Sequence, residues 1–414
     1  MNDHWHDVPL DRNSGGESIG RREFLILMIA ASLSTRYGSA QAAEDTRARF
    51  EKMSKEAERR GLAEPFKGIT TDGKVVEGLF PIKPTGVSTV PARQATEKFL
   101  ASLTTEQRAK VLFPIDDSEW RKWMNQHFYQ RQGVSFQEMT PPQREAAFGL
   151  VSASLSAKGV RLTRDIMRLN ETLAELSGDH EFLGEWLYFI TIMGKPSATE
   201  PWGWQLDGHH AIINYFALGD QVVMTPHFAG SEPVIATSGK YKGTAILQEE
   251  QEQGLRLIQA LSDAQRKKAI LGFSKTGNNN LTEAFKDNVV LDYAGICLSE
   301  LPTRYQQQMI EVAGLYLGNM DEGHAKVKMD EVKRYLDSTY FAWIGGTDAD
   351  SVFYYRIHSP VVLIEFDHQR PANLRGTGAT QPTRQHIHTV VRTPNGNDYG
   401  KDLLRQHYLR SHGG

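Results

Sequence analysis

Three stretches near the C-terminus decide the fold: Phe353-Tyr-Tyr-Arg-Ile-His-Ser-Pro360, Val361-Val-Leu-Ile-Glu-Phe-Asp-His368 and His386-Ile-His-Thr-Val-Val-Arg392. Each is rich in β-branched and aromatic residues, which is typical of strands in a sheet. Together they carry four of the fourteen histidines in the chain, with two carboxylates and two arginines. We therefore expect three neighbouring strands that bring a cluster of polar side chains together.

Length and composition are those of a globular protein. The 414 residues are 40% hydrophobic and 23% charged, with a formal net charge of −3. This balance has no basic excess that would indicate a nucleic-acid partner. Cys297 is the single cysteine of the sequence and cannot form an internal disulfide. We expect it to be a small buried apolar residue.

The N-terminus resembles a twin-arginine export signal. Arg21 and Arg22 precede a short apolar run, Phe24 to Ser34, and a small-residue cleavage site ends at Ala42. An apolar run of this length is too short to span a bilayer, but it suits the apolar region of a signal peptide. We predict a cleaved signal peptide over residues 1–42. The mature protein would then be periplasmic or secreted, with the twin-arginine export machinery as a partner and no stable membrane insertion.

The remaining chain divides by its periodicity. Residues 43–94 read as an extended N-terminal arm with a short amphipathic helix near its start. From residue 95 onward, helical spacing of apolar residues gives way to strand-like alternation at about residue 186. A hairpin turn at 219–220 leads into a strand at 221–227. Later helices are predicted at 248–271, 281–287, 301–317, 323–337 and 401–409, and strands at 339–345, 353–358, 361–367 and 386–392.

The order of these elements repeats itself. Three segments match at offsets of 158, 162 and 151 residues: Phe99–Lys110 with Leu257–Lys268, Glu138–Leu155 with Glu300–Leu317, and Trp202–Phe216 with Phe353–Asp367. We predict one domain over 95–411, made of half-repeats at about 95–245 and 250–411. The expected fold is α+β, with two helix-then-strand halves that share an antiparallel sheet and helices packed outside it. The alternative is chance agreement on a common pattern.

The clearest candidate metal ligands are His386 and His388. Two residues apart in a strand, they point to the same face and lie about 6.5 Å apart along the backbone. Two imidazoles at that spacing can share one ion, since each needs about 2.0–2.1 Å between nitrogen and zinc. A cupin-like site is set aside, because Thr-Val-Val-Arg392 follows where a cupin would supply a glutamate. The alternative is a pair of core histidines.

A second histidine pair, His209 and His210, follows Asp207-Gly208. Neighbours in a strand face opposite ways, so at most one of the two would join a site on a given face. Gly208 indicates a backbone bend that re-aims them. We predict that one of them completes the site of His386 and His388.

Charged side chains on the same strands complete the candidate site. Glu365 and Asp367 share a strand face, and a buried carboxylate needs a partner. Either residue would complete a metal shell or act as a general base. Arg356 and Arg392 would hold an anionic group of substrate or intermediate. An internal salt bridge is the alternative for all four.

Several motifs together resemble the family called domain of unknown function 3500. They are Leu103-Thr-Thr-Glu-Gln-Arg108, Pro201-Trp-Gly-Trp-Gln-Leu-Asp-Gly-His-His210, Tyr354-Tyr-Arg-Ile-His358, Leu363-Ile-Glu-Phe-Asp367, His386-Ile-His388 and Asn397-Asp-Tyr-Gly-Lys-Asp-Leu-Leu404. The resemblance covers about 95–411 and implies no particular reaction. Asp207 stands where this family often has Glu, and His368 where it often has Asn.

Two hypotheses follow from the sequence. The first is a metal-dependent exported enzyme, leaning to hydrolysis of a small-molecule or envelope-derived substrate at a zinc-like divalent ion. The same ligands could hold iron or copper in a metal-dependent oxidoreductase. The second is a non-enzymatic periplasmic protein that binds its ligand in an aromatic-lined groove.

Overall fold

The computed structural model describes residues 44–374 and 380–412, so the predicted signal peptide lies outside the described residues. The chain divides into two units, Met1–Lys52 and Met53–Gly414. In the first unit residues 44–52 are helical. The second unit carries all of the predicted site residues. Within the described ranges, no helix is both long enough and apolar enough to cross a lipid bilayer.

A single mixed sheet organises the second unit. Counted over the described residues it has thirteen strands, in the order β1-β3-β4-β5-β7-β13-β12-β11-β10-β8, with β2 beside β3, β6 beside β5 and β9 beside β10. The pairs are antiparallel except that β1 runs parallel to β3 and β8 runs parallel to β10. The strands are β1 Leu112–Phe113, β2 Val134–Ser135, β3 Tyr188–Met193, β4 Trp202–Gly208, β5 Ala211–Leu218, β6 Gln221–Val223, β7 His227–Ser231, β8 Ile270–Gly272, β9 Ile296–Cys297, β10 Tyr340–Gly345, β11 Phe353–His358, β12 Leu363–His368 and β13 Ile387–Arg392. This confirms the predicted α+β class with a mostly antiparallel sheet.

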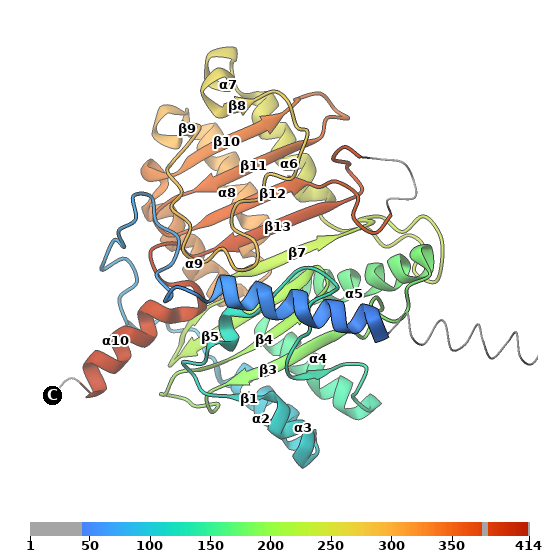
Figure 1. The fold of residues 1–414 in the computed structure, drawn as a ribbon. Helices are drawn as coiled ribbons and strands as arrows, with labels where there is room; N and C mark the ends of the chain where they lie inside the picture. The colour runs from blue at the N-terminus through green and yellow to red at the C-terminus, as the bar shows by residue number, and fades with distance from the viewer. Residues whose placement is uncertain (1–43, 375–379, 413–414) are drawn as a thin grey trace, which may run out of the picture. The chain divides into compact units, whose positions relative to one another are not determined.

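Helices supply the second layer. They are α2 Val90–Ser102, α3 Thr105–Val111, α4 Pro141–Ser154, α5 Ala157–Ser177, α6 Gln248–Ala260, α7 Asp263–Ala269, α8 Thr303–Leu317, α9 Glu322–Arg334 and α10 Lys401–His412. In Figure 1, α4, α5, α6, α8 and α9 lie behind the strands.

Two predicted elements are divided in the structure. The helix predicted at 248–271 is wrong as one element, because Ser262 caps a new helix by accepting a hydrogen bond from the backbone N–H of Gln265. Such a cap satisfies an N–H that would otherwise lack a partner at the start of a helix. The strand predicted at 221–227 is also interrupted, at residues 224–226. Pro226 lies in this break, and proline has no N–H to donate to a strand partner.

One face of the sheet, here called the helix face, is covered by α4, α5, α6, α8 and α9. This face is rich in aromatic residues. The indole nitrogen of Trp204 donates to Ser154 Oγ on α4 at 3.2 Å. Tyr355 donates to the carbonyl of Glu250 on α6 at 2.9 Å. All four side chains are in the buried interior. Each aromatic ring thus adds apolar burial, while its polar atom keeps a hydrogen-bond partner.

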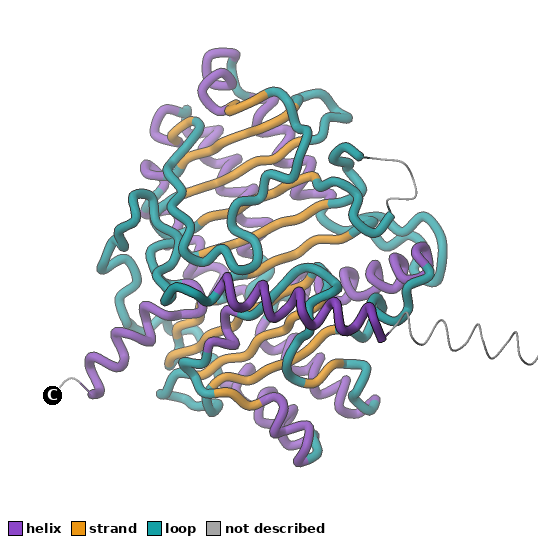
Figure 2. The backbone as a smooth tube through the Cα atoms, viewed as in Figure 1, coloured by secondary structure: helices purple, strands orange, loops and turns teal. Residues whose placement is uncertain are grey.

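The opposite face, here called the loop face, is polar although it is buried. Gln205 on β4 donates to the backbone carbonyl of Trp120 at 3.1 Å, and Arg392 on β13 donates to the carbonyl of Thr282 at 3.0 Å. Thr282 belongs to a loop segment, and Trp120 belongs to the short 3-10 helix Ser118–Arg121. Loops cross this face of the sheet, as Figure 2 shows in teal over the orange strands. Backbone groups in loops need partners when buried, and the polar strand residues supply them.

The two halves of the sheet meet where β7 pairs with β13. On each side of this junction the strand order ends in a short strand parallel to its neighbour. Each of these end strands follows directly after a short helix with a capping box, formed by Thr104 with Gln107 and by Ser262 with Gln265. The matching element order is compatible with the predicted half-repeats, which stay a prediction.

A substitution at Gly203 can test how closely the segment around Trp120 packs against the sheet. A Cβ atom at Gly203 would lie 2.3 Å from the carbonyl oxygen of Tyr215 and 2.5 Å from the ring of Trp120. Gly203→Ala should therefore destabilise the fold by about 1–3 kcal/mol, the usual effect of overpacking. The measurement is urea unfolding of both proteins.

Gly149→Ala is the matched control, because no atom lies within 4 Å of the added Cβ and Gly149 is inside α4. It should stabilise the fold by about 0.5–1 kcal/mol. Equal effects of the two substitutions would contradict the close packing described here.

Candidate metal centre

Three of the four predicted histidine ligands lie together. His386 immediately precedes β13 and His388 lies within it, while His210 is in the two-residue turn between β4 and β5. Their Nε2 atoms are separated by 2.9 Å for His386–His388, 3.0 Å for His210–His388 and 3.3 Å for His210–His386. All three residues are buried, and together they form a group that could hold a metal ion.

Hydrogen bonds at Nδ1, the ring nitrogen that faces away from the cluster, fix the tautomers of His386 and His388. His386 Nδ1 lies 2.7 Å from the backbone carbonyl of Arg370, and His388 Nδ1 lies 2.7 Å from Glu283 Oε1. Carbonyl and carboxylate oxygens accept hydrogen bonds, so both Nδ1 atoms carry the proton. In the neutral rings, each Nε2 then presents a lone pair toward the other at 2.9 Å. A proton or a metal cation between them would remove the resulting repulsion.

Burial disfavours the proton. It lowers the pKa of His386, and it holds the pKa values of His388 and His210 well below the ordinary value. Neighbouring rings add to this effect: His386 lowers the pKa of His388, and both lower that of His210. Neutral imidazoles are the form that binds metals.

The spacing of the three nitrogens fits one ion. With about 2.0–2.1 Å from each nitrogen to zinc, angles of about 90–107° at the metal give nitrogen separations of about 2.9–3.3 Å. The observed separations fall in this range. The hydrogen bonds from the outer nitrogens to a carbonyl and a carboxylate are the usual second layer of a histidine metal site.

The turn at 209–210 decides which of the two neighbouring histidines joins the site. His210 has a φ of 66°, a left-handed conformation that is uncommon outside glycine. This turn directs its Nε2 to His386 and His388, whereas His209 Nδ1 lies 2.7 Å from Asn170 Oδ1. The bend predicted from Gly208 is a tight hairpin turn. A strained residue at such a position indicates a functional constraint.

Sequence reasoning missed Glu283, which positions His388. It lies in the segment predicted as a helix at 281–287, and that prediction is wrong because the segment forms turns. The N–H groups of Leu281 and Thr282 donate to Glu365 at 2.9 Å each instead of supporting a helix. These hydrogen bonds join residues far apart in the chain, so no local sequence pattern indicates them.

Glu365 and Asp367 hold this segment in place. Glu365 also accepts from Tyr354 at 2.7 Å. Asp367 Oδ2 accepts from the N–H of Asn279 at 2.6 Å, and Asp367 Oδ1 lies 3.0 Å from Lys275 Nζ. Burial raises the pKa of Asp367 to about 7, while Lys275 acts in the opposite direction. Both carboxylates thus contact the loop that carries Glu283, and neither belongs to the group of three histidines.

The two predicted arginines lie on the loop face. Arg356 on β11 lies opposite Glu365 on β12 in the strand register. It donates a hydrogen bond to the carbonyl of Asp292 at 3.3 Å. Arg392 is fully buried and forms ion pairs at 2.7 Å with Asp287 and with Asp398. Two carboxylates therefore already surround the Arg392 guanidinium.

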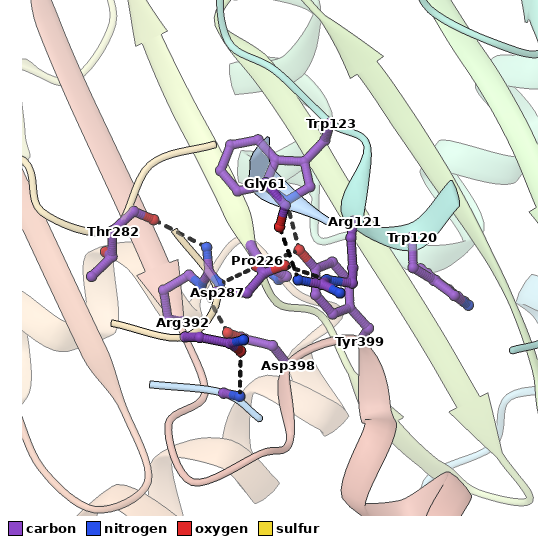
Figure 3. A network of polar contacts seen from close by, with 12 residues as sticks. Gly61, Trp120, Arg121, Trp123, Pro226, Thr282, Asp287, Arg392, Asp398 and Tyr399 are labelled. Atoms are coloured by element: carbon purple, nitrogen blue, oxygen red, sulfur yellow. Dashed lines mark hydrogen bonds and ion pairs between the residues drawn. The ribbon is translucent and has the colours of Figure 1, made fainter. Parts of the chain in front are cut away.

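Figure 3 shows that Arg392 belongs to a larger network. Asp287 also binds Arg121 at 2.8 Å and accepts from Tyr399 at 2.9 Å. Arg121 in turn donates to the carbonyl of Gly61 at 3.1 Å. This network connects the segment at Gly61, the loop face and the turn before α10.

Arg392→Ala should destabilise the protein by about 3–5 kcal/mol, because it leaves Asp287 and Asp398 buried without their shared cation. Denaturant unfolding measures the loss. Arg256→Ala is the control, since Arg256 and Glu252 form an exposed pair one helical turn apart, and its loss should stay within about 0.5 kcal/mol. A loss for Arg392→Ala as small as that of the control would show that the network is not structural.

A comparison with known proteins assigns the chain to a family. Neither a curated protein nor a solved structure matches it. A family model described as a protein of unknown function (DUF3500) matches residues 85–401, which include the three clustered histidines and Glu283. The chain belongs to the DUF3500 family.

Proposed function

We propose that this chain is an exported metal-dependent enzyme, leaning to hydrolysis, in which His210, His386 and His388 hold one divalent ion. The observation that carries the proposal is the pair of Nε2 lone pairs facing each other at 2.9 Å, with a third imidazole within 3.3 Å. Arg21 and Arg22 support export. The substrate would be a small molecule or a compound derived from the cell envelope.

A bound zinc ion would lower the pKa of a coordinated water and thereby supply a nucleophile at neutral pH. The protein supplies the three neutral imidazoles and the surroundings that keep them neutral. Phe228 packs edge-on against His388, with ring centroids 5.0 Å apart. An apolar ring beside the ligands limits solvent and lowers the local dielectric constant, which tunes a metal site.

Glu283 is proposed as a positioning residue. By accepting from His388 Nδ1, it orients that ring and raises its basicity toward a metal. Asn280 donates to the same oxygen at 2.9 Å, so the carboxylate is fixed in turn. We propose that Glu365 and Asp367 act through this loop, while the anion-binding role of Arg356 stays a prediction.

The identity of the metal separates hydrolysis from oxidation. Imidazole suits zinc, copper and iron alike, so a metal-dependent oxidoreductase is the second candidate. Metal analysis of protein purified after export from a native host decides between them: stoichiometric zinc favours hydrolysis, and stoichiometric iron or copper favours the oxidoreductase.

Replacing His386 and His388 together by alanine should abolish stoichiometric metal, because one imidazole alone remains. Elemental analysis of the exported protein measures this. His209→Asn is the matched control, since His209 is adjacent to His210 but bonds to Asn170, and it should retain the metal. Sub-stoichiometric metal in the unaltered protein, unchanged by the double substitution, would refute the proposal.

Glu283→Gln should weaken metal affinity by about 10–100-fold, the usual effect of removing a carboxylate that orients a histidine ligand. Competition with a chromogenic chelator measures the affinity. Glu311→Gln, at an exposed position on α8, is the control and should leave the affinity unchanged. If both variants bind the metal as tightly as the unaltered protein, Glu283 does not position the ligand.

A further inference from the structure

A second candidate site lies on the helix face, away from the histidine cluster. It consists of an inner cavity of about 40 Å³ and an outer cavity of about 250 Å³. The two cavities share the lining residues Val222, Val223, Lys328, Glu331 and Asn397. They are therefore adjoining parts of one recess, bordered by β6 and α9.

The sheet separates this recess from the proposed metal centre. His227 and Val391 line the inner cavity and are paired across β7 and β13. Side chains alternate along a strand, so Val391 points to the face opposite His388. A ligand in the recess would thus lie on the other side of the sheet from the histidine cluster.

Most of the surface that lines the inner cavity is apolar, and its polar side chains include the His227 ring. The apolar walls are Val222, Val223, Met224, Leu317, Met320 and Val391. Burial lowers the pKa of His227 to about 4, so this ring is neutral at pH 7. No hydrogen bond joins the His227 ring to another residue in the part of the chain that the structure describes. This cavity suits a short aliphatic group.

The size of the inner cavity limits that group. A cavity needs about 10–15 Å³ to hold one group the size of a water molecule. The inner cavity of about 40 Å³ therefore holds roughly three such groups. The isopropyl side chain of valine has three carbon atoms. An aromatic ring is too large for this space.

Charged side chains lie at the junction of the two cavities. Glu331 Oε2 lies 3.4 Å from Lys328 Nζ, but Glu331 Oε1 is buried and has no hydrogen-bond partner. A buried acceptor without a donor is costly, and a ligand donor would satisfy it. Three residues later on α9, Arg334 lines the outer cavity, as does Lys83. Neither cation forms an ion pair with another described residue.

We propose that this recess binds a free α-amino acid with a short aliphatic side chain. Its ammonium group would bind Glu331, its carboxylate would bind Arg334 and Lys83, and its side chain would enter the inner cavity. Residues three apart on a helix lie on the same face, so Glu331 and Arg334 present opposite charges side by side. This arrangement matches the adjacent charges of an amino-acid zwitterion. The inference does not depend on the proposed metal-dependent activity.

Isothermal titration of the full exported chain with L-valine tests the proposal. Valine should bind, whereas N-acetylvaline, valinamide and phenylalanine should bind at least roughly tenfold more weakly, since each loses a charge-assisted hydrogen bond or exceeds the inner cavity. Removal of metal with a chelator should not change the result. Absence of binding by valine, or equal binding of all four compounds, would overturn the proposal.

Two substitutions locate the site. Glu331→Gln should weaken valine binding by roughly tenfold or more, through loss of a charged hydrogen bond. Lys333→Gln, at an exposed position in the same turn, should not change it. Met320→Trp should block binding by filling the inner cavity without altering charge. Unchanged valine affinity in either Glu331→Gln or Met320→Trp would place the bound amino acid elsewhere.

Discussion

The burial of carboxylates on the loop face is the constraint on which this structure depends. Glu365 and Asp367 are completely buried, and an isolated buried charge is strongly unfavourable. Backbone N–H groups of residues 279–282 and the ammonium of Lys275 offset that cost. The segment must therefore lie on the sheet, and this placement brings Glu283 to His388. The interactions that hold the fold thus also shape the candidate site.

The sequence predicts best where local pattern and long-range structure agree. The strand predicted at 353–358 is present with those bounds, because its alternating residues fit both faces of a buried sheet. The helix predicted at 301–317 is present as Thr303–Leu317. At 281–287, by contrast, the local pattern favours a helix, but the carboxylate of Glu365, more than eighty residues later in the chain, accepts from the N–H groups of Leu281 and Thr282.

The same distinction holds for the candidate site. A His-x-His pair in a strand predicts two rings on one face, and the structure places His386 and His388 together. The choice between His209 and His210 depends on the φ of a single turn residue, which neighbouring residue types do not determine. Glu283 reaches the site only through tertiary hydrogen bonds, so its role has no signature in the order of residues.

The short strands at the two edges of the sheet affect whether sheets of separate molecules can pair. β1 has two residues and β8 has three, so each outermost strand offers only a few unpaired backbone groups. Long free edges allow sheets of separate molecules to join and aggregate, and short ones prevent such growth. The sheet, with thirteen strands in the described residues, can therefore stay open at both ends and still offer little edge to the sheet of another molecule.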